Sequence, residues 1–219
     1  MYGCALCIRE EIYAPDHPMV LATKNNMAQL YASEEQYNEA ISLFETVIRE
    51  YRENSTKDSV FLATVYDNLS AVYREKERYE DAIGICTKGL NIRKSIYGKK
   101  SLDYAISLNN LALIYYEMGA LNDAVDIFND ALVIKKDVLP KIHGQISIGY
   151  FNLALVYDKL NRDNEALENY RASMEIDNEL GAYEDVLLTA EYVAEIYERN
   201  GMLEEAEVYR TLCSEDDAQ

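Results

Sequence analysis

Four cysteines and two histidines are the residues of this sequence whose types could bind a metal. Cys4 and Cys7 form a C-x-x-C pair, a spacing at which two thiolates can share one metal ion. No second pair and no nearby histidine completes a site around them. We therefore expect reduced thiols that act as small apolar side chains, with Cys86 filling the core in place of a phenylalanine, and we predict no metal and no cofactor.

The histidines, His17 and His143, are the other metal ligands to consider. They fall in equivalent loops of a repeating pattern, three units apart. With two helix layers in each unit, and about 8–10 Å between packed helices, they cannot share a ligand. We interpret them as markers of the repeat and not as a metal site.

Signatures of catalysis are missing from the sequence. It contains no Walker phosphate loop, G-x-G-x-x-G, H-E-x-x-H or G-x-S-x-G motif. Carboxylates are plentiful, but they fall on predicted helix faces turned to solvent. We therefore predict no catalytic residues, and an enzyme is the weakest of the three functions considered.

Asparagine residues recur in one short phrase and are the first candidates for binding. They are spaced by 42 residues, at Asn26, Asn68, Asn110 and Asn152. An amide side chain offers a donor and an acceptor together, which suits the backbone of an extended peptide. The alternative is that these asparagines only form hydrogen bonds to neighbouring helices.

The stretch Leu108–Lys136 shows the elements that position them. Apolar residues at three-four spacing predict a helix on each side of Gly119, where a turn needs a small residue or a positive φ. Small Ala112 opposite small Ala124 lets the two helices approach closely. Neither helix could bury its apolar face alone.

The same pattern returns five times along the chain. The second helices keep the period with Ala40, Ala82, Ala124, Ala166 and Ala206. A fifth copy of the first-helix phrase, Tyr192 to Tyr197, follows after 40 residues instead of 42. Helix pairs at a fixed period predict a solenoid in which each unit contacts only its neighbours.

The residues of the third unit resemble the signature of the tetratricopeptide repeat, through Leu111, Ala112, Tyr115, Gly119, Ala124 and Phe128. The 42-residue period and Asp16-His17-Pro18 are most similar to the kinesin-light-chain type of this repeat. The resemblance covers nearly the whole chain. It implies an all-α, right-handed α-solenoid, or superhelix, of helix-turn-helix repeats, whose concave groove is lined by the first helix of each pair.

Three segments follow from the repeat boundaries. Residues 1–18 are predicted to be the second helix of a preceding repeat plus a linker, 19–213 to be five repeats, and 214–219 to be a disordered acidic tail. The first segment lacks the polar outer face of a natural cap, so we favour a piece of a longer array. Its apolar residues Tyr2, Leu6 and Ile8 predict end-to-end self-association.

A formal net charge of -18 limits the classes of partner that the protein can bind. Nucleic acids and anionic membranes bind through clustered Lys and Arg, so we expect neither as a partner. The sequence has no apolar run of about 20 residues and no basic-then-apolar leader, and we expect a cytoplasmic protein.

The predicted binding surface is the groove side of the first helices. Besides the four asparagines, the predicted groove residues are Ile106, Leu113, Tyr116, Ile148, Phe151, Leu155, Tyr192 and Glu195. The surface turns acidic near the fifth repeat, through Asp158, Glu191, Glu195 and Glu198. We therefore expect a partner segment with an apolar core and a basic flank. Alternatively, neighbouring helices cover Ile106 and Ile148 and leave no patch.

The function predicted from these features is a non-catalytic interaction scaffold that binds an extended peptide or partner segment in its groove. The alternative is the sensor region of a larger regulator, with a protease or nucleotide-switch domain outside this sequence.

Overall fold

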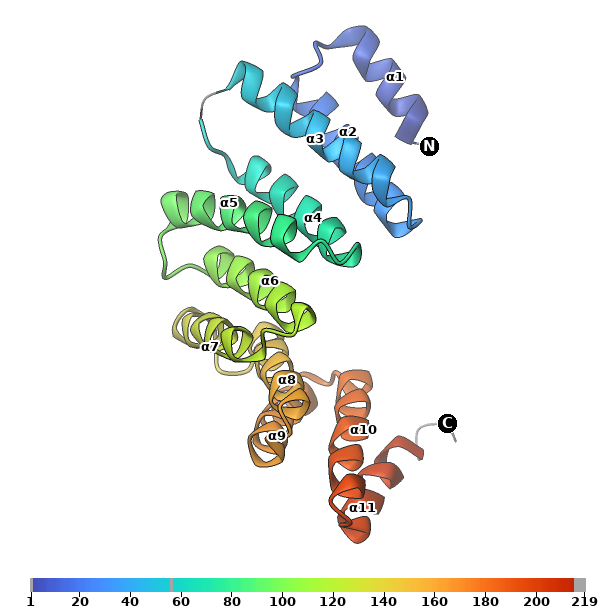
Figure 1. Ribbon diagram of the computed structural model, residues 1–219, viewed down its shortest axis with the longest axis vertical. Helices are drawn as coiled ribbons and strands as arrows, with labels where there is room; N and C mark the ends of the chain where they lie inside the picture. The colour runs from blue at the N-terminus through green and yellow to red at the C-terminus, as the bar shows by residue number, and fades with distance from the viewer. Residues whose placement is uncertain (1, 56, 215–219) are drawn as a thin grey trace. The chain divides into compact units, whose positions relative to one another are not determined.

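The computed structural model describes residues 2–55 and 57–214, and every regular element within them is an α-helix (Figure 1). The predicted all-α fold of helix-turn-helix repeats is therefore confirmed. The chain divides into two compact units, Met1–Lys99 and Lys100–Gln219, which are described separately below.

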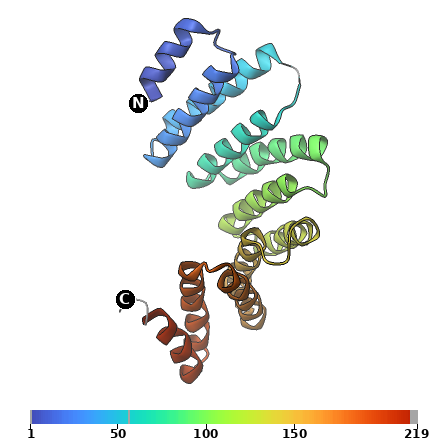
Figure 2. The same cartoon turned by 180° about the vertical axis from the view of Figure 1, so that it is seen from behind.

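Unit 1 contains five helices: α1 (Tyr2–Ile12), α2 (Pro18–Ser33), α3 (Tyr37–Asn54), α4 (Val60–Glu75) and α5 (Tyr79–Tyr97). The closest packing is within the pairs α2–α3 and α4–α5, whose members run side by side (Figures 1 and 2). Helix α1 packs on α2 and lies within the segment 1–18 for which a lone second helix was predicted.

Unit 2 contains six helices in three pairs: α6 (Leu102–Met118) with α7 (Leu121–Val138), α8 (Gly144–Lys159) with α9 (Asp163–Leu180), and α10 (Tyr183–Arg199) with α11 (Leu203–Ser214). Successive pairs contact each other through α7–α8 and α9–α10. Residues 215–219 of the predicted disordered tail lie outside the described part of the chain, and Ser214 ends α11.

The turn within each pair contains one residue in the left-handed backbone conformation, at an equivalent position in every repeat. Gly119 (φ 86°) and Asn161 (φ 56°) adopt the geometry expected of them. Glu35, Glu77 and Gly201 occupy the corresponding positions, also at positive φ. In each case the preceding tyrosine carbonyl accepts a backbone bond from five residues on, as Tyr115 O does from Ala120 N at 2.9 Å, which closes the helix end.

The start of the first helices also repeats. His17 Nδ1 accepts a hydrogen bond from Met19 N at 3.2 Å, and His143 Nδ1 accepts one from Gln145 N at 3.0 Å. Ser59 and Ser101, at the intervening positions of the period, cap α4 and α6 in the same way. The two histidines are thus helix caps, which gives a physical reason for their equivalent placement.

The core is built from small residues and, in the pairs α2–α3, α6–α7 and α8–α9, one large aromatic residue. Ala112 and Ala124, which were predicted to face each other, are both fully buried. The same position recurs every 42 residues and holds Phe44, Cys86, Phe128 and Tyr170, each at most 1% exposed. Cys86 therefore fills the core where other repeats place an aromatic ring, as predicted.

Candidate functional site

The predicted groove residues are divided between the two units. Asn26 lies on α2 and Asn68 on α4, both in unit 1. The other ten lie on the first helices of unit 2: Ile106, Asn110, Leu113 and Tyr116 on α6, Ile148, Phe151, Asn152 and Leu155 on α8, and Tyr192 and Glu195 on α10. Most of the candidate site therefore lies in unit 2.

A first cavity, called here the tyrosine cavity, has a volume of about 430 Å³ and brings together three predicted residues, Tyr116, Leu155 and Tyr192. Its other lining residues are Asp158, Lys159, Asn161 and Arg199. The Lys159 ammonium lies 4.5 Å from the centroid of the Tyr116 ring. Burial and the nearby Asp158 carboxylate raise the pKa of Tyr116, so its hydroxyl remains a donor at neutral pH.

A second cavity, called here the carboxylate cavity, has a volume of about 220 Å³ and includes the predicted residues Ile148 and Phe151. Helices α8, α9 and α10 all contribute to its walls. Ile148 is 47% exposed and Ile106, on α6, is 36% exposed. The alternative in which neighbouring helices cover these two isoleucines is therefore not what the structure shows.

An aromatic cluster connects the two cavities. Phe151 of the carboxylate cavity and Tyr192 of the tyrosine cavity have ring centroids 5.6 Å apart, in an edge-on arrangement. Both rings also lie 5.6 Å from the ring of Tyr170, which is completely buried beneath them. Burial raises the pKa of Tyr170 above its usual range. The cluster thus brings a lining residue of each cavity into direct contact.

Two of the asparagines form hydrogen bonds to the first helix of the preceding repeat. Asn68 Nδ2 donates to Asn25 Oδ1 at 3.1 Å, and Asn152 Nδ2 donates to Asn109 Oδ1 at 3.0 Å. These bonds to neighbouring helices are those of the alternative stated above. By contrast, the side chain of Asn110 makes no hydrogen bond with the described residues.

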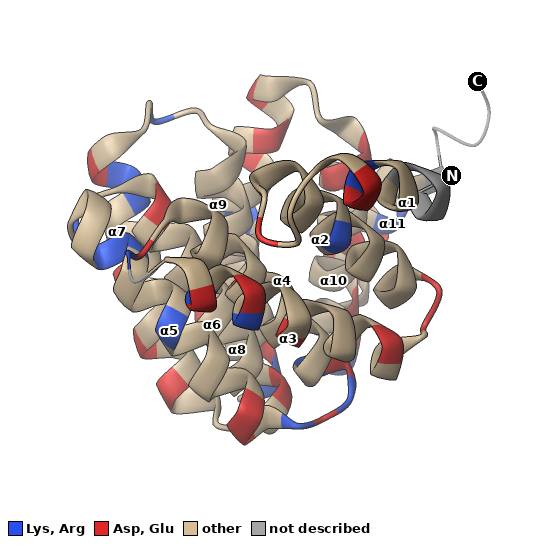
Figure 3. Cartoon of the chain, turned by 90° about the horizontal axis from the view of Figure 1, so that it is seen from above, with Lys and Arg blue, Asp and Glu red and all other residues tan. Residues whose placement is uncertain are grey.

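The acidic region near the fifth repeat is partly neutralised. Asp158 forms an ion pair with Arg199 at 2.5 Å, and Glu198 forms one with Arg210 at 3.0 Å. The Arg210 guanidinium holds the pKa of Glu198 below its usual value. Glu191 and Glu195 are exposed and pair with no described cation. Charges of both signs are spread over the helices of each unit (Figure 3).

Sequence reasoning missed the polar floor of the carboxylate cavity. Asp177 is 6% exposed, and its Oδ2 accepts a hydrogen bond from Ser147 Oγ at 2.5 Å. The signal was present in the period, because Asp177 stands 42 residues after the basic residue Lys135 and 84 after Arg93. A reversal of charge at one repeat position was the clue.

The described residues contain no group of three or more His, Cys, Asp or Glu side chains placed to hold a metal ion. Of the C-x-x-C pair, Cys7 is an exposed free thiol, and the side chain of Cys4 lies outside the described part of the structure. Within the same described residues, no helix is both long enough and apolar enough to span a bilayer.

Three family models match the chain, over residues 20–54, 61–137 and 149–180, and all three are described as tetratricopeptide repeat. Together they span most of the sequence. No curated protein sequence matches the chain.

Several solved structures share the fold. BtubC (BKLC) from P. vanneervenii is 18% identical, with a TM-score of 0.86 over 99% of this chain and 88% of its own. A putative kinesin light chain from Podosopora anserina is 20% identical, with a TM-score of 0.78 over 93% of this chain and 97% of its own. The Rap conjugation gene regulator of plasmid pLS20, in complex with the Phr* peptide, is 20% identical, with a TM-score of 0.69 over 96% of this chain and 60% of its own.

Proposed function

Because the chain belongs to the tetratricopeptide repeat family, we propose that it is a protein-interaction scaffold that binds an extended partner segment along the first helices of unit 2. The observation that carries this proposal is the pair of cavities whose lining residues Phe151 and Tyr192 are in ring contact. Apolar and aromatic side chains from α6, α8, α9 and α10 line them, together with charged residues that include Lys159 and Arg199 in the tyrosine cavity and Asp177 and Asp185 in the carboxylate cavity. A concave surface that combines apolar anchors with polar and charged groups suits recognition of a peptide.

The chemistry of the surface suits a segment with an apolar core and a basic flank. Leu155 and the rings of Tyr116 and Tyr192 would receive the apolar core. The exposed Glu191 and Glu195, together with the net charge of -18, would attract the basic flank and speed association at low salt. The Rap conjugation gene regulator was solved with a peptide bound, which supports peptide binding by a protein of this fold.

A peptide array followed by affinity measurements tests the proposal. Peptides with apolar cores and lysine or arginine flanks are expected to bind better than the same cores with acidic flanks. For the best peptide, Leu155→Ala is expected to weaken binding about tenfold or more, because a buried apolar anchor contributes more than a rim charge. Asn110→Ala should weaken it by a smaller factor, and Asn152→Ala by less still, since Asn152 already donates to Asn109.

The matched control is Val133→Ala on α7, which shortens an apolar side chain that is 59% exposed and lines neither cavity. It should leave affinity unchanged. Equal binding of acidic and basic peptides, or an unchanged affinity after both Leu155→Ala and Asn110→Ala, would rule out this surface as the binding site.

A second candidate function is the sensor region of a larger regulator. The regulator of plasmid pLS20 favours it, because its similarity to this chain covers only 60% of its own length and leaves room for a further domain. Sequencing the complete gene decides between the two functions. An adjoining protease or nucleotide-switch domain would support the sensor function, and a gene without such a domain would contradict it.

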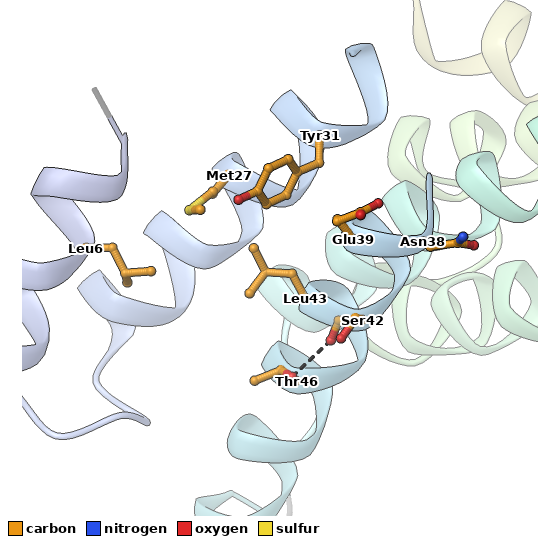
Figure 4. Close-up of a pocket in the computed structure, with 8 residues that line it drawn as sticks. All are labelled: Leu6, Met27, Tyr31, Asn38, Glu39, Ser42, Leu43 and Thr46. Atoms are coloured by element: carbon orange, nitrogen blue, oxygen red, sulfur yellow. Dashed lines mark hydrogen bonds between the residues drawn. The ribbon is translucent and has the colours of Figure 1, made fainter. Parts of the chain in front are cut away.

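We further propose that α1 mediates self-association between copies of the chain. Ile8 and Ile12 are 57% and 66% exposed. Leu6, in contrast, faces a cavity of about 450 Å³ whose other lining residues are Met27 and Tyr31 of α2 and Asn38, Glu39, Ser42, Leu43 and Thr46 of α3 (Figure 4). The surface between copies would therefore involve the two isoleucines, whereas Leu6 lies on the side of α1 that faces α2 and α3.

Sedimentation velocity tests this proposal. Association should increase with protein concentration, and replacing Ile8 and Ile12 by serine should shift the protein towards the monomer. A protein that stays monomeric at high concentration, or a double variant that associates as before, would contradict it.

A further inference from the structure

The carboxylate cavity contains a buried charge that the protein itself does not balance. Asp177 of α9 is 6% exposed, and no Lys or Arg among the described residues forms an ion pair with it. Its Oδ2 accepts hydrogen bonds from Ser147 Oγ at 2.5 Å and Ser173 Oγ at 3.3 Å. Its Oδ1 accepts none from the described residues. One carboxylate oxygen thus remains available.

The repeat pattern explains why the cation is missing. In the repeat of α4 and α5, Arg93 occupies the position of Asp177, and its partner is Asp67 at 2.6 Å. The position of Asp67 is taken by Phe151 in the repeat of α8 and α9. Phe151 lines the same cavity as Asp177 and can supply no charge. This repeat therefore reverses the sign at one position without placing an opposite charge at the other.

The energetic consequence is a strong preference for a cation. Burial, and to a smaller extent the nearby Asp185 carboxylate, raise the pKa of Asp177. A carboxylate shielded from water without a cation is destabilising unless it is protonated or paired. Asp185 itself is exposed on α10, where it adds negative charge to the lining of the same cavity.

The walls and size limit what the cation can be. Apolar side chains of Ile148, Leu180 and Leu188, each close to half exposed, surround the way in to Asp177. The volume of about 220 Å³ lies below the range of about 300–1,000 Å³ typical of drug-sized ligands. It suits a single side chain. A guanidinium binds best to two carboxylate oxygens at once, whereas an ammonium is a compact charge that needs only one.

We propose that the carboxylate cavity binds a primary ammonium group on an unbranched apolar stem, with Asp177 Oδ1 receiving the ammonium and Ile148, Leu180 and Leu188 enclosing the stem. The source is a lysine side chain of the bound partner segment or a free aliphatic amine. The lysine source rests on the proposed function, and the amine source does not. Ser147 is a positioning residue, because its hydroxyl donates to Oδ2 and leaves Oδ1 without a hydrogen bond from the described residues.

The first test uses n-pentylammonium and its neutral analogue 1-pentanol, with binding followed by NMR shifts of the methyl groups of Ile148, Leu180 and Leu188. The cation is expected to bind at least tenfold more tightly than the alcohol. Asp177→Asn, which keeps an acceptor for Ser147, should reduce cation binding to the level of the alcohol. The matched control Asp126→Asn removes an exposed carboxylate on α7 and should change nothing.

A second variant provides a test that does not depend on whether Asp177→Asn folds correctly. Leu188→Trp narrows the cavity but leaves the carboxylate intact, and it should weaken cation binding about tenfold while the helical circular dichroism stays unchanged. Equal binding of the cation and the alcohol, or undiminished cation binding in both variants, would overturn the proposal.

The second test separates this inference from the proposed function. The best peptide of the array is compared with a version in which norleucine replaces its lysine, which removes only the ammonium. A loss of at least tenfold that disappears in Asp177→Asn assigns the lysine to the cavity. If neither the norleucine replacement nor Asp177→Asn changes peptide affinity, and pentylammonium does not bind, the ammonium site is ruled out but the proposed scaffold function stands. If pentylammonium binds but no peptide does, the ammonium site is supported and the proposed scaffold function is contradicted.

Discussion

Replacing Arg93 with methionine is expected to lower the free energy of unfolding by about 3–5 kcal/mol, because it strands the buried carboxylate of Asp67. The two side chains are only 8% and 12% exposed, and they form an ion pair at 2.6 Å. Burial raises the pKa of Asp67 to about 6 in spite of the attraction of Arg93. The site is also tightly closed, since a Cβ added to Gly89 would lie 2.9 Å from Asp67 Oδ1.

Urea unfolding at two pH values checks the sign of this effect. Without Arg93 the folded-state pKa of Asp67 rises further above 3.8, the ordinary pKa of an aspartate in the unfolded chain. The loss of stability should then be complete above the folded-state pKa and should shrink as the pH falls towards 3.8. The control is Arg52→Met, which breaks an exposed ion pair with Asp58 and should cost less than about 1 kcal/mol.

A loss that is equally small for Arg93→Met and Arg52→Met would contradict this account of the α4–α5 pair. The double variant Asp67→Leu with Arg93→Met provides a further check. It removes both charges, so much of the stability lost in the single variant should return.

Replacing Phe128 with alanine is expected to cost about 3–5 kcal/mol, the range for removal of a buried aromatic side chain. Phe128 is 1% exposed and packs with Ala112, Ala124 and Leu153 in one core cluster of unit 2. The cavity left behind could not close without moving α7 relative to its neighbours. Because neighbouring repeats support one another, we expect all of unit 2 to lose resistance to urea.

The control for this variant lies on the same helix. Val133→Ala shortens a side chain that is 59% exposed, and it should change the unfolding free energy by no more than about 0.5 kcal/mol. Similar losses for Phe128→Ala and Val133→Ala would mean that the large residue of this repeat does not support the core.

The period of the sequence was sufficient to predict the helix pairs, the turn at Gly119 and the core position of Cys86. These features depend on local patterns that repeat, so each copy supports the others. The left-handed conformation of Glu35 and Glu77 could be located only through the period, because glutamate does not favour a positive φ. Their strain is tolerated where packing of the two helices fixes the turn.

The binding surface was predictable only in part, for reasons specific to side chains. Exposure of Ile106 and Ile148 depends on how adjacent helices pack, which spacing alone does not give. The bonds that Asn68 and Asn152 make to Asn25 and Asn109 join residues 43 positions apart, across two repeats. The buried Asp177 breaks the pattern of its position, and a pattern predicts its exceptions least well.

Hydrogen exchange with and without the best peptide of the array tests the central claim, that the first helices of unit 2 bind the partner. Protection is expected in α8 and α10, at the segments that carry Phe151, Leu155 and Tyr192, and it should vanish in Leu155→Ala at the same peptide concentration. Protection confined to α7 or α11, or unchanged exchange throughout unit 2 at a saturating peptide concentration, would contradict the claim.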